Sequence, residues 1–200
     1  MSKAKSNVTT DFVLPIVVLV LICAVMSGLL AVTNNVTAPI IEEAERAANT
    51  AARKEVMPLA DAAGDADPFE EVKPENLPEP AAASMPSSIT GVYKATNSAG
   101  DTVGYTFSIT TQGYGGKNTL KMAVGVDMDG KITGVKVLDH KETAGLGSKI
   151  TTDQRFIGDF LSKGAAEIDG IDRISGATFS SNYYKAAIKD ALAAFELVKG

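Results

Sequence analysis

The first pattern in the chain is one long apolar run near its beginning. Residues Phe12 to Val32 include no charged side chain, and these roughly 21 positions are enough to cross a hydrocarbon core of about 30 Å as a helix. Small and apolar residues then recur between Glu and Arg from Ile40 to Val56, a spacing typical of an amphipathic helix. Asn34 to Pro39, between the two, carry a helix-start signal. The pattern predicts a membrane-spanning helix that continues into a helical stalk.

Short strand-like runs and turns alternate in the second half of the chain. The apolar runs between Gly, Asn and Asp turns predict β-strands at Ile89–Thr96, Thr102–Thr110, Leu120–Val126 and Ile132–Leu138. Helical spacing follows at Thr152–Leu161 and, more strongly, at Phe179–Val198. Strands first and helices later predict an α+β domain with a mostly antiparallel sheet and packed helices.

These patterns divide the chain into five parts. They are an N-terminal segment at 1–11, a transmembrane helix at 12–32, a juxtamembrane stalk at 33–57, a mostly irregular proline-rich connection at 58–88 and a folded domain at 89–200.

Charges around the apolar run predict its orientation. Lys3 and Lys5 precede the run, whereas the segment from its end to Ala44 has Glu42 and Glu43 but no Lys or Arg. Positive charge favours the cytoplasmic side, so we expect a cytoplasmic N-terminus, a single pass through the cell membrane and an extracytoplasmic domain. A cleaved signal peptide is the alternative, but its apolar region ordinarily has about 7–15 residues.

Composition excludes several classes of partner and site. The net charge of −5 and the absence of a basic stripe argue against nucleic acid. Cys23 is the only cysteine and lies inside the apolar run, so neither a disulfide within the chain nor a thiolate metal site is possible. His140 is the only histidine, which argues against a haem or zinc site, and we expect no metal.

The run from Asp172 to Ser181 holds Ser-Gly-Ala-Thr just before the strongest predicted helix. Helix N-termini attract phosphate through unpaired N–H groups and the macrodipole. Gly176 and Ala177 have almost no side chain, so a ligand can approach the main chain closely. The residues alone predict a phosphate-accepting turn with an exposed Thr178 hydroxyl, or, more plainly, an ordinary helix start.

A second segment, His140 to Lys149, follows the last predicted strand. Its two glycines, Gly145 and Gly147, surround Leu146, which predicts a loop with exposed backbone and an apolar side chain. Such a surface can lie flat against an aromatic ring. An ordinary strand-to-helix loop is the alternative.

Both segments resemble those of a known family. Ser-Gly-Ala-Thr resembles the flavinylation motif of the FMN-binding domains in the G subunit of the Rnf electron-transport complex and the C subunit of the sodium-pumping NADH:quinone oxidoreductase. His140–Gly147 is similar to their His-x-Glu-Thr-Pro-Gly-Leu-Gly stretch, with Ala144 in place of the usual proline. The glycine loop Gly113–Gly116 and the juxtamembrane residues Asn35, Thr37, Pro39 and Ile40 also match.

The resemblance implies one FMN, attached to Thr178 through a phosphoester bond by a separate flavin transferase. The loop would border the isoalloxazine ring, and Lys149 would face the phosphate. The residues expected at the cofactor are Ser175, Gly176, Ala177, Thr178 and Ser181 at the helix start, and Glu142, Thr143, Gly145, Leu146, Gly147 and Lys149 in the loop.

The resemblance also implies a function. The chain would be a membrane-anchored subunit that relays electrons among flavin and metal centres of other membrane and peripheral subunits, in a complex coupling ferredoxin-to-NAD electron transfer to ion pumping. It would have no catalytic residues and no complete active site of its own. The alternatives are the C subunit of the sodium pump, a free-standing extracytoplasmic flavoprotein and, from another class, a cofactor-free membrane-tethered binding module.

Overall fold

The structure is a computed structural model that describes residues 13–61, 67–72 and 88–199. The predicted N-terminal segment 1–11 with Lys3 and Lys5, most of the proline-rich connection and Gly200 lie outside the described residues. Internal contacts divide the chain into two units, Met1–Ala47 and Ala48–Gly200.

One long helix, α1 (Leu14–Val56), contains the apolar run from Leu14 onward. Its most apolar window has a mean hydropathy of 2.8, and none of that window is buried by the protein. By length and composition the helix can cross a membrane. The predicted helix start at Asn34–Pro39 is wrong, because α1 continues through Pro39. Loss of the one hydrogen bond that Pro39 cannot donate does not end a helix that continues on both sides of it.

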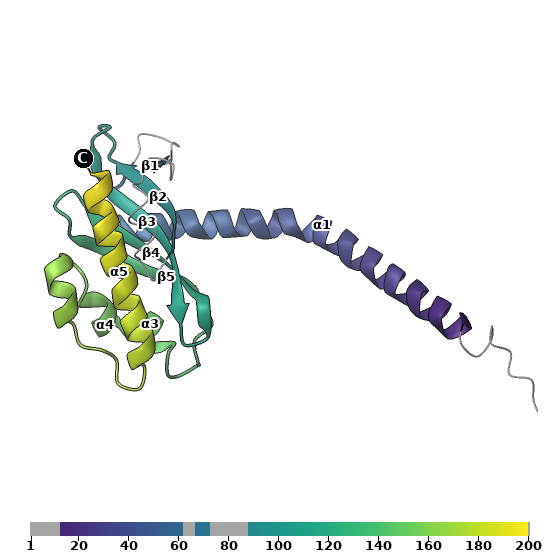
Figure 1. Cartoon of the computed structure of the whole chain (residues 1–200). Helices are drawn as coiled ribbons and strands as arrows, with labels where there is room; N and C mark the ends of the chain where they lie inside the picture. Colours follow the sequence, from purple (N-terminus) through teal and green to yellow (C-terminus); the bar gives the residue numbers. More distant parts are fainter. Residues whose placement is uncertain (1–12, 62–66, 73–87, 200) are drawn as a thin grey trace, which may run out of the picture. The chain divides into compact units, whose positions relative to one another are not determined.

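The folded unit is built on a five-stranded antiparallel sheet (Figure 1). Its strands follow one another in chain order: β1 (Phe69–Val72), β2 (Ser88–Thr96), β3 (Thr102–Gly113), β4 (Gly116–Asp127) and β5 (Ile132–His140). The four predicted strands and the antiparallel pairing are confirmed. Strand β1 was not predicted, because it has four residues with two glutamates and gains its order only by pairing with β2.

Four helical segments follow the sheet: α3 (Lys149–Thr152), α4 (Gln154–Gly158), the 3₁₀ helix η3 (Ala165–Gly170) and α5 (Thr178–Val198). The single helix predicted at Thr152–Leu161 is wrong in detail, because Asp153 is extended and its carboxylate accepts hydrogen bonds from Arg155 N and Phe156 N. Asp153 therefore caps a new helix instead of continuing the old one. Helix η3 was not predicted.

Helix α5 lies across one face of the sheet (Figure 1) and packs mainly on β3. It buries the apolar face that the sequence predicted, including Tyr184, Ile188, Leu192 and Phe195. These side chains meet Phe107 and its neighbours on the sheet in one continuous core.

The last turn of α1 packs on the opposite face of the sheet. A Cβ atom on Gly125 would overlap Val56 O, and one on Gly134 would lie 2.6 Å from Val56 Cα. Thr133 Oγ1 donates a hydrogen bond to the same Val56 carbonyl, at 2.5 Å. The paired glycines of β4 and β5 thus make room for the end of α1, and Thr133 satisfies its terminal carbonyl.

Candidate functional site

The Ser-Gly-Ala-Thr turn leads directly into α5. Gly176 has φ +80°, a left-handed conformation that favours glycine. Ala177 occupies the N-cap position and provides no side-chain hydrogen bond to the first turn. Thr178 is the first residue of α5, and its side chain is exposed. An accessible hydroxyl therefore stands at a helix start whose N–H groups receive no side-chain cap.

The buried Ser181 side chain forms hydrogen bonds to the backbone of this turn. Its buried Oγ donates to Ala177 O at 2.9 Å and accepts from Ile174 N at 3.2 Å. The structure thus places Ser181 inside the protein, where it fixes the backbone that presents Thr178.

The loop after β5 forms a tight turn next to this helix start. Leu146 N and Ser148 N both donate to Thr143 O at 3.2 Å, and Gly145 N donates to Ser148 Oγ at 2.9 Å. Leu146 is 50% exposed, and its Cδ2 would be 3.7 Å from a Cβ on Gly176. The two segments that the sequence singled out therefore lie side by side.

A hollow of about 300 Å³ opens between them. It is lined by Tyr114, Thr143, Leu146, Gly147, Gly176, Ala177, Thr178, Phe179 and Ser180. Six of these were expected at the cofactor from the sequence, whereas Ser175, Gly145, Ser181, Glu142 and Lys149 do not line it. The volume lies at the lower end of the range for small-molecule sites, roughly 300–1,000 Å³.

Sequence reasoning missed the aromatic side of the hollow. The rings of Tyr114 and Phe179 meet edge to face with centroids 6.1 Å apart, and the rings of Phe179 and Tyr183 lie 4.8 Å apart. Tyr114 is 69% exposed and Phe179 is 45% exposed. The sequence holds two features that could have predicted this side of the hollow. Tyr114 is an aromatic residue inside a glycine turn, and Phe179 is an aromatic residue at the start of α5 outside its buried face.

Glu142 lies behind the hollow. Its Oε1 accepts a hydrogen bond from Tyr114 N at 2.8 Å, and its Oε2 accepts one from Ser180 Oγ at 2.5 Å. Its own N–H donates to His140 Nδ1 at 3.3 Å, so the histidine makes an ordinary strand-end hydrogen bond. The carboxylate is thus occupied by the protein itself.

The two remaining expected residues lie at the periphery. Lys149 is exposed at the start of α3, and its N–H donates to Leu146 O at 3.1 Å. Ser175 is exposed one residue before Gly176.

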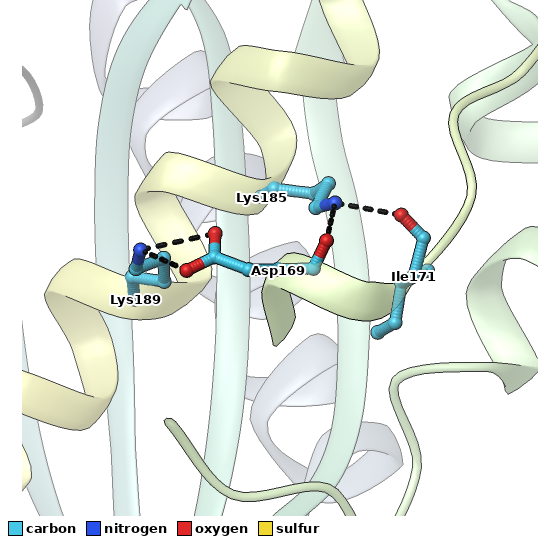
Figure 2. Close-up of polar contacts among 4 residues, drawn as sticks. All are labelled: Asp169, Ile171, Lys185 and Lys189. Carbon is cyan, nitrogen blue, oxygen red and sulfur yellow. Dashed lines mark hydrogen bonds and ion pairs between the residues drawn. The ribbon is translucent and has the colours of Figure 1, made fainter. Parts of the chain in front are cut away.

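A second set of polar contacts holds the chain just before the motif (Figure 2). Lys185 Nζ donates to Ile171 O at 2.6 Å and to Asp169 O at 3.2 Å. Lys189 Nζ contacts both carboxylate oxygens of Asp169, at 2.9 and 3.1 Å. The hydrogen bond from Lys189 and its positive charge lower the pKa of Asp169.

Larger hollows lie elsewhere, but their linings are less suited to an aromatic cofactor. One of about 430 Å³ lies between η3 and α5, among lysines, aspartates and Arg173. Another of about 370 Å³ lies beside β5, where Tyr184 has a buried hydroxyl without a hydrogen-bond partner among the described residues. Burial raises the pKa of that hydroxyl. The smaller hollow combines apolar rings, bare backbone and a free hydroxyl, which is why we favour it.

Comparison with known proteins shows the family to which the chain belongs. Residues 113–193 match the family model of the FMN-binding domain, and residues 17–56 match that of the RnfG N-terminal region. The chain is 32% identical over 190 residues to the G subunit of the Na(+)-translocating ferredoxin:NAD(+) oxidoreductase complex of Acetobacterium woodii, covering 90% of this chain and 89% of the relative. The chain belongs to the family of Rnf complex G subunits.

Two further relatives extend the similarity. The G subunit of the ion-translocating oxidoreductase complex of Methanosarcina acetivorans is 32% identical over 88% of each chain. The protein of the same name from Stutzerimonas stutzeri is 33% identical over 88% of this chain and 76% of the relative. Every residue that lines the hollow lies within the part that matches the FMN-binding domain.

Proposed function

We propose that this chain is a membrane-anchored electron-transfer subunit of an Rnf-type ion-translocating oxidoreductase, and that it carries one FMN linked through a phosphoester to Thr178. One observation carries the proposal. The exposed Thr178 hydroxyl stands at the rim of an apolar hollow, at a helix start without a side-chain cap, inside the region that matches the FMN-binding domain.

The residues present fit both ends of such a cofactor. At the phosphate end, the first-turn N–H groups of α5 and its macrodipole favour a negative charge beside Thr178. At the ring end, Leu146, Tyr114 and Phe179 offer apolar and aromatic surface, and the exposed Gly176 leaves backbone accessible. Aromatic rings favour offset or edge contacts with other rings.

The chain's own residues position the cofactor and leave its redox chemistry to the flavin, which exchanges electrons when bound. Thr178 fixes one end, and the loop and aromatic side chains orient the other. The open hollow leaves the site accessible to the centres of neighbouring subunits, with which electrons are exchanged. No side chain needs to act as an acid or base in this role.

Attachment is tested by intact mass and by in-gel flavin fluorescence after denaturation, on the full chain co-produced with a flavin transferase. The wild type should carry one covalent FMN, and Thr178→Val should lose it completely, since no other hydroxyl replaces the lost one in position. Thr143→Val, at another threonine lining the hollow, is the matched control and should keep the covalent mass. Covalent flavin in Thr178→Val would refute the assignment and direct attention to Ser175 or Ser180. A colourless wild type would favour a cofactor-free module.

Orientation is a second part of the proposal. The Lys3 and Lys5 bias before α1 supports a cytoplasmic N-terminus and an extracytoplasmic flavin domain. A reporter active only outside the cytoplasm, fused after Gly200, should be active, while a reporter active only in the cytoplasm should be silent. The reverse pattern would contradict this orientation and place the flavin on the other side of the membrane.

A further inference from the structure

The half-buried Glu142 carboxylate joins three segments that are distant in sequence. We infer that Glu142 is a positioning residue, which fixes the spacing between the aromatic side of the hollow and the start of α5 and so holds the flavin ring in one orientation. This inference rests on the proposed function. We call the Glu142 carboxylate, the Tyr114 N–H and the Ser180 hydroxyl the Glu142 clasp.

The two hydrogen bonds of the clasp reach opposite sides of the hollow. Tyr114 lies 28 residues before Glu142, and Ser180 lies 38 residues after it. Ser180 is 2% exposed and lies two residues after Thr178. One carboxylate therefore ties the backbone that carries an aromatic wall to the first turn that carries the attachment hydroxyl.

Two glycines provide the space for this carboxylate. A Cβ on Gly113 would overlap Glu142 Oε1, and a Cβ on Gly147 would overlap Oε2. The Gly147 Cβ would also lie 3.0 Å from Ser180 Oγ. Both glycines are buried. They are needed to admit Glu142, and this need exists whether or not a ring is bound.

Glu142 is not among the residues that line the hollow. Its effect on the ring is therefore carried through Tyr114 and through the first turn of α5. A competing interpretation is that its negative charge alone acts on the flavin, by disfavouring an anionic reduced form and lowering the potential. The two interpretations differ in what they predict for glutamine, which is uncharged but has nearly the same shape.

The experiment compares Glu142→Gln, Glu142→Ala and Ser180→Ala in the full chain in detergent, co-produced with a flavin transferase. Asp139→Asn is the matched control, because it removes one exposed carboxylate three residues from Glu142. Covalent mass, visible circular dichroism of the flavin band and midpoint potential are measured for each. Far-ultraviolet circular dichroism reports whether each variant is folded.

A glutamine side chain can keep both contacts, because its oxygen accepts from Tyr114 N and its amide donates to Ser180 Oγ. Glu142→Gln should therefore keep the wild-type flavin dichroism. Glu142→Ala should keep the covalent bond but shift the equilibrium between the seated and displaced ring by about tenfold toward the displaced state, as expected for losing hydrogen bonds to a charged group. Ser180→Ala should shift it in the same direction, and adding it to Glu142→Ala should have little further effect.

Equal dichroism in all variants would overturn the inference. So would Glu142→Gln and Glu142→Ala changing the potential by the same amount with unchanged dichroism, since only the charge would then matter. If Glu142→Ala does not fold, Ser180→Ala decides, because it removes a single oxygen. Absence of covalent flavin in the wild type would contradict the proposed function instead, so the two failures are distinguishable.

Discussion

Two anchors hold the Ser-Gly-Ala-Thr segment, one at each end, and they are built differently. Downstream is the Glu142 clasp, in which the carboxylate accepts hydrogen bonds from a backbone N–H and from a buried serine. Upstream, Lys185 and Lys189 on α5 hold Asp169 and the Ile171 carbonyl (Figure 2). The first anchor lies next to the hollow, and the second joins α5 to η3 and to the residue that follows it.

The two anchors differ in their exposure to solvent and in the space around their side chains. Side chains of the upstream ion pair are 45% and 75% exposed, so water and salt screen it. The Glu142 carboxylate instead fits between two glycines with no room for a Cβ. A group confined in this way has few alternative positions, whereas long exposed side chains can rearrange. Close packing therefore holds the end of the motif next to the hollow, and exposed charges hold the other end.

The largest effect should come from closing the space around Glu142. In Gly147→Ala the new Cβ collides with the carboxylate and forces the clasp open, so the free energy of unfolding should fall by about 1–3 kcal/mol in urea titrations. Gly158→Ala is the matched control, because nothing lies near its Cβ and alanine favours the helix of α4. Combining Gly147→Ala with Glu142→Ala should recover part of the loss, since the colliding atoms are then absent. A Gly147→Ala variant as stable as the wild type would show that the clasp can accommodate an added methyl group. The two anchors would then not differ in how closely they are packed.

A smaller effect is expected at the upstream anchor. Lys185→Met keeps the length of the side chain but removes two hydrogen bonds to carbonyls, so the free energy of unfolding should fall by about 1–2 kcal/mol. The dichroism of the bound flavin should stay as in the wild type, because Lys185 binds the carbonyls of Asp169 and Ile171, neither of which lines the hollow. Lys121→Met, at an exposed lysine of β4, is the control and should be neutral in both measurements. If Lys185→Met displaced the ring as strongly as Glu142→Ala, both anchors would be equally important for the cofactor.

The long elements of the fold were predictable because each is long enough to carry a clear pattern of apolar and turn residues. Apolar runs between turn residues predicted β2 to β5, and helical spacing predicted the buried face of α5. Elements of four to six residues were missed or merged, because windows that short contain too few positions for a period. Strand β1 depends on pairing with β2, and the break at Asp153 depends on one side-chain cap. Both are tertiary or single-residue effects that override propensity.

The candidate site was predicted only in part. Chemistry and family resemblance pointed to Thr178 and Leu146, and the structure brings both to one hollow. Tyr114 and Phe179 were missed, because their convergence depends on the β3–β4 turn folding over the start of α5. Glu142 was expected beside the ring; it does not line the hollow, and its carboxylate accepts hydrogen bonds from Tyr114 N and Ser180 Oγ. Sequence reveals which groups are chemically capable, but it does not reveal which of them are already used by the protein.

The smallest effect concerns the ion pair between Lys189 and Asp169, and it should depend on pH. The hydrogen bond and charge of Lys189 lower the pKa of Asp169 from its ordinary value of 3.8 in the folded state. A lowered pKa adds stability that is fully present above the ordinary value and is lost as the pH falls through the folded pKa. Lys189→Gln should therefore be slightly less stable than the wild type near neutral pH, and the difference should shrink below about pH 4. Urea midpoints measured across this range test the expectation, with Lys121→Gln as the control for loss of one positive charge. A difference that stays constant down to low pH would show that Lys189 acts through packing of its alkyl chain, and the upstream anchor would then resemble the downstream one in relying on shape.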